Sequence, residues 1–231
     1  MKPLTFLAAL LLPLAALAQT TTILVTNSSG RYNARITAVP CEGNECKGEA
    51  KVQLLEKERN RAVQTFTTEH MIVRLDSNRQ KGEKQAAPAE GQYPLIFDDF
   101  NFDGEEDVAI RNGNNGSYGG LSYDVYVYNK ARKTFTRDKW LTTLASENLG
   151  MFETDRRRRQ LTVRQKDGCC WHATIVYGMN ANQKMVKVEE ITEDARDGGD
   201  MVTVTTSRLE NGKMKKTVKQ YKTSEYYKEN R

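Results

Sequence analysis

Short runs rich in β-branched and aromatic residues recur along almost the whole chain, and this pattern constrains the fold most strongly. Gly, Asn and Asp separate the runs, and helical periodicity is scarce. The runs lie at residues 22–26, 51–55, 71–75, 94–97, 123–128, 160–164, 171–177, 184–191 and 201–208. This spacing predicts an all-β fold, an antiparallel meander of hairpins arranged as an incomplete propeller or a sandwich.

Two places in this pattern predict local detail. A period of two along 123–128 places Tyr123, Val125 and Val127 on one face, which we expect to be the buried face. Beyond the last run, Asn211-Gly212 is the signal of a tight hairpin turn between two terminal strands.

The first eighteen residues, 1–18, have the features of a signal peptide. Residues 4–12 are almost entirely apolar, and Ala16-Leu17-Ala18 fits the small-residue pattern of a cleavage site. The apolar stretch is too short to span a bilayer, so we predict no transmembrane segment. The residue after the cut is Gln19 and not cysteine, so a lipid anchor is not expected. These features predict a soluble, exported, periplasmic protein.

The remainder, 19–231, is predicted to form a single all-β domain, with a possible subdivision near the polar stretch 77–92. The net charge of +5 is mild and evenly spread, which argues against nucleic acid as a partner. The chain has two histidines, which excludes a zinc site with three or more histidine ligands.

The four cysteines, Cys41, Cys46, Cys169 and Cys170, allow three disulfide pairings, and the sequence does not choose among them. Export permits disulfides. A local Cys41–Cys46 bond would close a tight loop between two predicted strands and contribute about 2 kcal/mol. Cys169 and Cys170 would then form a vicinal disulfide or remain as two buried thiols.

The acidic run from Asp99 to Asp107 predicts a calcium-binding loop. Oxygen-bearing side chains occupy its positions one, three, five and nine, and Gly104 at position six permits a sharp turn. The expected ligands are Asp99, Asn101, Asp103, the backbone carbonyl of Glu105, and Asp107. The flanks are strand-like and position twelve is Ile110, so the loop is not an EF-hand. The alternative is an acidic turn without a metal.

A glycine-rich loop comes next, made of Gly116, Ser117, Tyr118, Gly119 and Gly120. Glycines on both sides of Ser117-Tyr118 disfavour a regular strand. Tyrosine offers a large contact area with little loss of entropy. We therefore expect a loop that enters a partner's cleft with Tyr118 as its anchor. A flexible turn with a partly buried tyrosine is the alternative.

Three segments together resemble one small protein family. They are DFNFDGEEDVAIRNGNNGSYGGLSYDVYVYN at 99–129, DGCCWH at 167–172 and RLENGKM at 208–214. The family consists of periplasmic immunity proteins that protect bacteria from peptidoglycan-hydrolysing effectors of a bacteria-killing type IV secretion system. Its members are similar in fold to periplasmic inhibitors of i-type lysozyme and are associated with bound calcium. The resemblance covers residues 94 to about 220 well.

This resemblance implies that Asp99, Asn101, Asp103 and Asp107 hold calcium and that the loop from Gly116 to Gly120 approaches a hydrolase active site. The function it predicts is inhibition of a bacterial peptidoglycan hydrolase, a lysozyme-like effector. Because the chain is basic, a neutral or acidic hydrolase is the better partner.

Two other classes of function compete with inhibition. A calcium-dependent adhesion or glycan-binding module would use the same acidic loop. An enzyme would need Cys169 or Cys170 with His172 as its base, or a pair of carboxylates, and the best-organised carboxylates are those expected to bind calcium. On an extended strand Cys170 and His172 lie about 7 Å apart, too far for a direct hydrogen bond, and periplasmic oxidation would silence the thiol. We therefore predict that the protein is not an enzyme.

Overall fold

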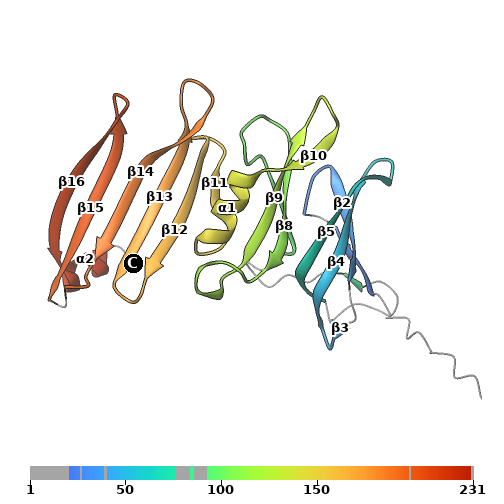
Figure 1. Ribbon diagram of the computed structural model, residues 1–231, viewed down its shortest axis with the longest axis horizontal. Helices are drawn as coiled ribbons and strands as arrows, with labels where there is room; N and C mark the ends of the chain where they lie inside the picture. Colours follow the sequence, from blue (N-terminus) through green and yellow to red (C-terminus); the bar gives the residue numbers. More distant parts are fainter. Residues whose placement is uncertain are drawn as a thin grey trace, which may run out of the picture.

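The computed structural model describes residues 21–26, 28–38, 41–75, 84–85, 93–197 and 199–229. The predicted signal peptide at 1–18 and nearly all of 77–92 lie outside the described residues. The described strands form three sheets that follow one another along the molecule in chain order (Figure 1). No helix in the described ranges is long and apolar enough to cross a membrane.

An N-terminal sheet begins the fold. Its strands are β1 (Thr21–Val25), β2 (Tyr32–Ala38), β3 (Cys41–Glu42), β4 (Glu45–Glu56), β5 (Arg61–Arg74) and β6 (Lys84–Gln85). The order is β3-β4-β2-β1-β6, with β5 also paired to β4. The β1–β6 pair is parallel and the other pairs are antiparallel. Burial alternates along β2, as a period of two requires of a strand with one face on a core.

The central sheet is covered on both faces. Its strands are β7 (Leu95–Asp98), β8 (Asp107–Gly113), β9 (Ser122–Asn129) and β10 (Thr134–Arg137), in the order β10-β9-β8-β7. In β8, Val108 and Ile110 face a core shared with the N-terminal sheet, whereas Ala109 faces a second core. Because both faces are covered, this strand is buried almost throughout and lacks the alternation of a half-exposed strand.

Helix α1 (Lys139–Glu147) follows β10 and lies between the central and C-terminal sheets (Figure 1). Asp138 caps its N-terminus, because the carboxylate accepts a hydrogen bond of 2.8 Å from the backbone N–H of Leu141. Leu141 and Leu144 are buried in the second core with Val125 of β9. The helix thereby joins the central sheet to the strands that follow it.

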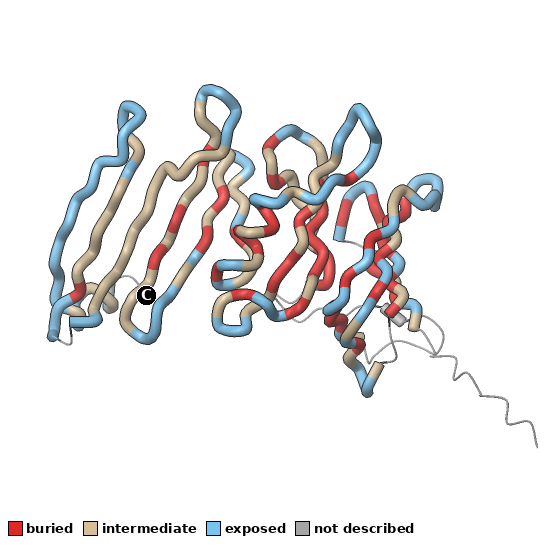
Figure 2. Tube along the Cα trace, viewed as in Figure 1, coloured by how far each residue is buried: buried red, intermediate tan, exposed pale blue. Residues whose placement is uncertain are grey.

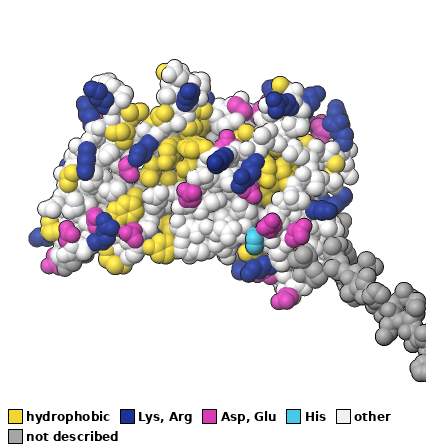
Figure 3. Space-filling model, in the orientation of Figure 1, with side chains coloured by type: hydrophobic (Ala, Val, Ile, Leu, Met, Phe, Trp, Pro, Cys, Tyr) yellow, Lys and Arg dark blue, Asp and Glu magenta, His cyan; other side chains and the backbone are white. Residues whose placement is uncertain are grey.

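The C-terminal sheet is a meander of consecutive neighbours. Its strands are β11 (Glu153–Asp155), β12 (Gln160–Asp167), β13 (Trp171–Met179), β14 (Met185–Asp194), β15 (Met201–Glu210) and β16 (Lys213–Lys222), followed by helix α2 (Thr223–Glu229). Burial falls away from β12 towards β16, all of whose residues are exposed (Figure 2). Hydrophobic side chains on the visible face likewise gather over the middle of the molecule (Figure 3).

The all-β antiparallel prediction is confirmed, and each of the nine predicted runs lies in or overlaps a strand. Tyr123 and Val125 are fully buried and Val127 is half-buried, as the period of two predicts. Asn211 and Gly212 have φ values of 51° and 76° between β15 and β16, which confirms the tight turn. The sequence pattern does not predict α1. The single domain at 19–231 stays a prediction.

Candidate functional site

The acidic loop joins β7 to β8 and is folded on its own backbone. Gly104 has a φ of 90°, a conformation that favours glycine. The carboxylate of Asp99 accepts hydrogen bonds from the backbone N–H groups of Asp103 and Gly104, at 3.0 and 2.9 Å. Asp103 in turn accepts one from the N–H of Glu105, at 2.8 Å. These bonds hold the carboxylates of Asp99 and Asp103 in one compact turn.

The side chain of Glu105 is committed to two cations. Its carboxylate lies 2.7 Å from Lys130 Nζ and 2.7 Å from Arg31 Nη1. The hydrogen bond from Lys130, followed by that from Arg31, holds the pKa of Glu105 below its usual range. The carboxylate is therefore already paired with two cations. This pairing is compatible with the sequence-based prediction that Glu105 contributes its backbone carbonyl.

Asp107 lies beneath the loop as the first residue of β8 and is fully buried. It accepts hydrogen bonds from the N–H groups of Phe100 and Tyr128, at 3.0 and 2.8 Å. Burial raises the pKa of Asp107 to about 7, and the nearby carboxylates of Asp103 and Asp99 add to the rise. A cation near these groups would favour the ionised form of this carboxyl.

The chemistry of this donor set fits a hard cation. Asp99, Asn101 and Asp103 offer carboxylate and amide oxygens, which are the ligands that calcium takes in proteins. Within the described part of the chain, no three His, Cys, Asp or Glu side chains group closely enough to hold a metal ion by themselves. A calcium site would therefore also need the amide oxygen of Asn101 and backbone carbonyls. The calcium ligands stay a prediction.

The glycine-rich loop forms a single 3-10 turn, Ser117–Gly119, between β8 and β9. Tyr118 has left-handed backbone angles (φ 58°, ψ 30°), and its side chain is 62% exposed, the highest value of any large hydrophobic residue that the structure describes. A Cβ on Gly116 would lie 2.9 Å from the carbonyl oxygens of Gly120 and Leu121, so this position requires glycine. The turn therefore presents an aromatic ring from a tightly closed loop.

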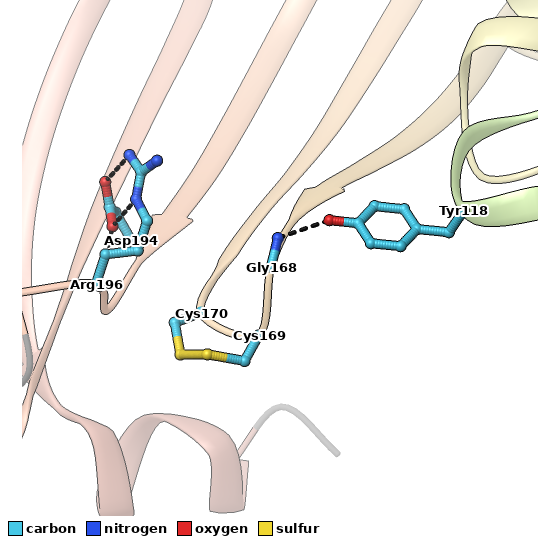
Figure 4. Close-up of a disulfide and its surroundings, with 6 residues drawn as sticks. All are labelled: Tyr118, Gly168, Cys169, Cys170, Asp194 and Arg196. Carbon is cyan, nitrogen blue, oxygen red and sulfur yellow. Dashed lines mark hydrogen bonds and ion pairs between the residues drawn. A yellow bond between two sulfur atoms is a disulfide. The ribbon is translucent and has the colours of Figure 1, made fainter.

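Three contacts hold this turn against the rest of the molecule. Ser117 Oγ donates a hydrogen bond of 2.8 Å to the carbonyl of Glu147 at the end of α1. The N–H of Gly168, at the tip of the β12–β13 hairpin, donates one of 2.7 Å to Tyr118 Oη (Figure 4). The ammonium of Lys166 lies 4.3 Å from the centre of the Tyr118 ring. Tyr118 is thus exposed to solvent but fixed in position, because the loop contacts α1 and the β12–β13 hairpin.

Both disulfides join cysteines that are close in sequence. Cys41–Cys46 links β3 to β4, and Cys169–Cys170 is a vicinal disulfide next to Gly168 at the hairpin tip (Figure 4). The alternative of two buried thiols at Cys169 and Cys170 is wrong, because both are bonded and Cys169 is exposed. In this state neither can act as a thiol nucleophile with His172.

An apolar groove of about 710 Å³ lies beside the turn. It is lined by Tyr93, Ile96, Asp98, Phe100, Ser117, Tyr118, Gly120, Leu121, Leu149, Gly150, Met151, Phe152 and Thr154. One wall comes from β7, an edge strand of the central sheet, and the other from the segment leading into β11, an edge strand of the C-terminal sheet. Phe100 and Phe152 meet edge to face, with ring centres 5.3 Å apart. An Asp98–Arg156 ion pair joins β7 to the turn that follows β11.

The structure places the predicted site residues in two neighbouring groups. The acidic loop follows β7 at one end of the strand, and Tyr118 lines the groove that β7 borders. Lys166, Gly168 and the groove are not predicted from the sequence. No local signal marks them, because the contacts join distant segments of the chain: Ser117 and Glu147 are 30 residues apart, and Tyr118 and Gly168 are 50 residues apart.

Taken together, the fold and the site define an all-β protein with two disulfides and an exposed tyrosine beside an apolar groove. No profile of a known protein family matches the chain, and no curated protein matches it. A solved structure described as that of a Xanthomonas type IV secretion system related protein is similar in fold, with a TM-score of 0.59 and 24% sequence identity. The similarity covers 87% of this chain and 94% of that one.

Proposed function

We propose that this protein is a periplasmic inhibitor of a bacterial peptidoglycan hydrolase, acting as an immunity protein. The observation that carries the proposal is Tyr118, a 62% exposed ring held on a closed turn at the rim of an apolar groove. The likeness of fold to a protein related to a Xanthomonas type IV secretion system is in keeping with this role. The segments at 99–129, 167–172 and 208–214 also resemble those of immunity proteins, which is in keeping with the same role.

The geometry of the turn favours tight binding. A free loop loses conformational entropy when a partner immobilises it, whereas the contacts from Gly168, Lys166 and Glu147 have already ordered this one. Tyrosines in well-packed pockets are frequent hot spots of interfaces. In the proposed complex the Gly116–Gly120 loop enters the active-site cleft of the hydrolase, backed by the β12–β13 tip. Substrate is then excluded by occupancy of the cleft.

We further propose that the acidic loop binds calcium through Asp99, Asn101, Asp103 and Asp107 and the carbonyl of Glu105. Bound calcium would neutralise carboxylates that are now held close together and would fix the connection between β7 and β8. Because β7 forms a wall of the groove, the ion would stabilise the surface that Tyr118 shares.

A lysis assay tests the proposed inhibition. Tagged protein is used to isolate its partner from the periplasm, and the partner's lysis of purified cell walls is followed by turbidity with and without the inhibitor. We expect the inhibitor to reduce lysis and Tyr118→Ala to reduce it less. If the protein instead binds cell walls with no hydrolase present, and a chelator abolishes that binding, the calcium-dependent glycan-binding function replaces the proposal.

A further inference from the structure

The last strand, β16, is the outer edge of the C-terminal sheet and lies at the end of the molecule (Figure 1). It pairs with β15 along all ten residues without a register shift, from Met201 opposite Lys222 to Glu210 opposite Lys213. Every residue of the strand is exposed. An edge strand has N–H and C=O groups on its outer side that no neighbouring strand pairs, so it is a template for another extended chain.

The charge on this edge is of one sign. Residues 213–222 contain five lysines and no acidic residue, so the net charge of +5 is less evenly spread than composition suggests. Lys215 pairs with Glu210 at 2.6 Å, and Lys222 with Glu225 at 3.5 Å. Of the ion pairs found in the described ranges, none includes Lys213, Lys216 or Lys219.

The face of β16 that carries Lys215 and Lys219 is also hollowed. A depression of about 470 Å³ is lined by Val204, Thr206, Arg208, Glu210, Lys215, Lys216, Thr217, Lys219 and Tyr221. Arg208 is paired with Glu189 across β14 and β15. Among the basic residues of this lining, Arg208 and Lys215 are paired, whereas Lys216 and Lys219 take part in none of the ion pairs found in the described ranges. Their ammonium groups lie beside the open backbone of the edge.

Lysines on an edge strand also prevent self-association. Antiparallel pairing of two copies of β16 centred on Thr217 would set Lys215 opposite Lys219 in both halves, and like charges directly opposite are destabilising. The same side chains would favour a strand that carries carboxylates at those positions. The edge thus discriminates by charge between a second copy and an acidic strand.

We propose that β16 is a docking site for an extended, acid-rich segment of a partner protein, which adds a seventh strand to the C-terminal sheet. Main-chain hydrogen bonds would supply affinity, and acidic side chains at alternate positions would meet Lys219 in the depression and Lys213 beyond its end, with Lys215, which also pairs with Glu210, between them. Tyr118 lies far from this edge, where the C-terminal sheet contacts the central sheet, and β16 is the strand of the C-terminal sheet farthest from that contact. The proposal therefore does not rest on the proposed inhibition.

A labelled peptide tests this site in the full-length protein. The probe has ten residues, with glutamate alternating with threonine and valine, and its binding is followed by fluorescence polarisation. Two control peptides have glutamine in place of glutamate or N-methyl groups on alternate backbone amides. We expect the probe to bind, and both controls to bind at least tenfold more weakly, because one lacks the charges and the other the main-chain donors.

Matched variants locate the site. Lys213→Glu with Lys219→Glu should weaken the probe about tenfold, because two attractions become repulsions. Lys47→Glu with Lys51→Glu makes the same change of charge on exposed positions of β4, an interior strand, and should leave binding unchanged. Circular dichroism confirms that both variants are folded.

Three results would overturn the proposal. The first is that the N-methylated peptide binds as tightly as the unmodified probe. The second is that the Lys213→Glu, Lys219→Glu variant binds the probe as tightly as the wild type does. The third is that the protein binds phosphatidylglycerol vesicles but does not bind the peptide. Loss of that vesicle binding in the Lys213→Glu, Lys219→Glu variant would identify this edge as a membrane-surface site.

Discussion

The hydrogen bond from Gly168 to Tyr118 links the exposed turn to the C-terminal sheet, and Tyr118→Phe tests its contribution. Tyr118→Phe keeps the ring and its contact with Lys166 but removes the oxygen that accepts the N–H of Gly168 at 2.7 Å. We expect the fold and the exposed ring to persist. The amide of Gly168 loses its acceptor and should exchange with solvent almost as fast as in a free peptide.

The magnitude follows from the two contacts. A hydrogen bond contributes about 0.5–1.5 kcal/mol and an exposed cation–π contact about 0.5–1 kcal/mol. Opening the turn in the wild type therefore costs about 1–2.5 kcal/mol, which slows exchange at Gly168 about 5- to 70-fold. Lys166→Ala keeps the acceptor and should lower this protection only about 2- to 5-fold.

Amide exchange measured by NMR at neutral pH provides the assay. The amide of Val163, in the buried part of β12, is the internal control and should be equally protected in all three proteins. Unchanged protection of Gly168 in Tyr118→Phe would refute the idea that the tyrosine hydroxyl holds the turn. It would also remove the argument that the loop is ordered before binding.

Three further predictions concern stability. At 10 mM calcium, a site with a dissociation constant on the order of 10⁻⁴ to 10⁻³ M should add about 1.4–2.7 kcal/mol to the free energy of unfolding and raise Tm by about 3–10 °C. Asp99→Asn should abolish this increase. An equal increase in the variant would exclude the acidic loop as the calcium site. Asp138→Ala removes the cap of α1 and should cost about 1 kcal/mol in urea unfolding, and no loss would mean that the cap is not stabilising. Replacing Cys41 and Cys46 by serine should lower the free energy of unfolding by about 2 kcal/mol in the same measurement, because the disulfide closes a short loop in the unfolded chain. A variant as stable as the wild type would contradict this.

The strands and the tight turn could be predicted because their causes are local. The alternation of Tyr123, Val125 and Val127 reports directly which face is buried, and Asn211-Gly212 supplies the two positive φ angles that the hairpin needs. Helix α1 was not predicted from the sequence, because its apolar face is short. The cap at Asp138 and the spacing of Leu141 and Leu144 are the signals that mark it.

The arrangement of the sheets and the surroundings of Tyr118 could not be predicted, because they depend on contacts between distant segments. The exposure of Tyr118 is consistent with its flanking glycines, but its bond to Gly168 spans 50 residues of chain. The groove likewise requires two separate sheet edges to face each other. The spacing of oxygen side chains in the acidic loop is local, whereas its ion pairs with Arg31 and Lys130 are not.

The inhibition constant of Tyr118→Ala against the isolated hydrolase, relative to the wild type, tests the central claim most directly. Trp140→Ala is the matched control, because this residue is also aromatic and exposed (39%) but lies on α1 outside the groove. The account predicts that inhibition weakens at least 30-fold for Tyr118→Ala and less than threefold for the control. A folded Tyr118→Ala protein that inhibits as strongly as the wild type would contradict it.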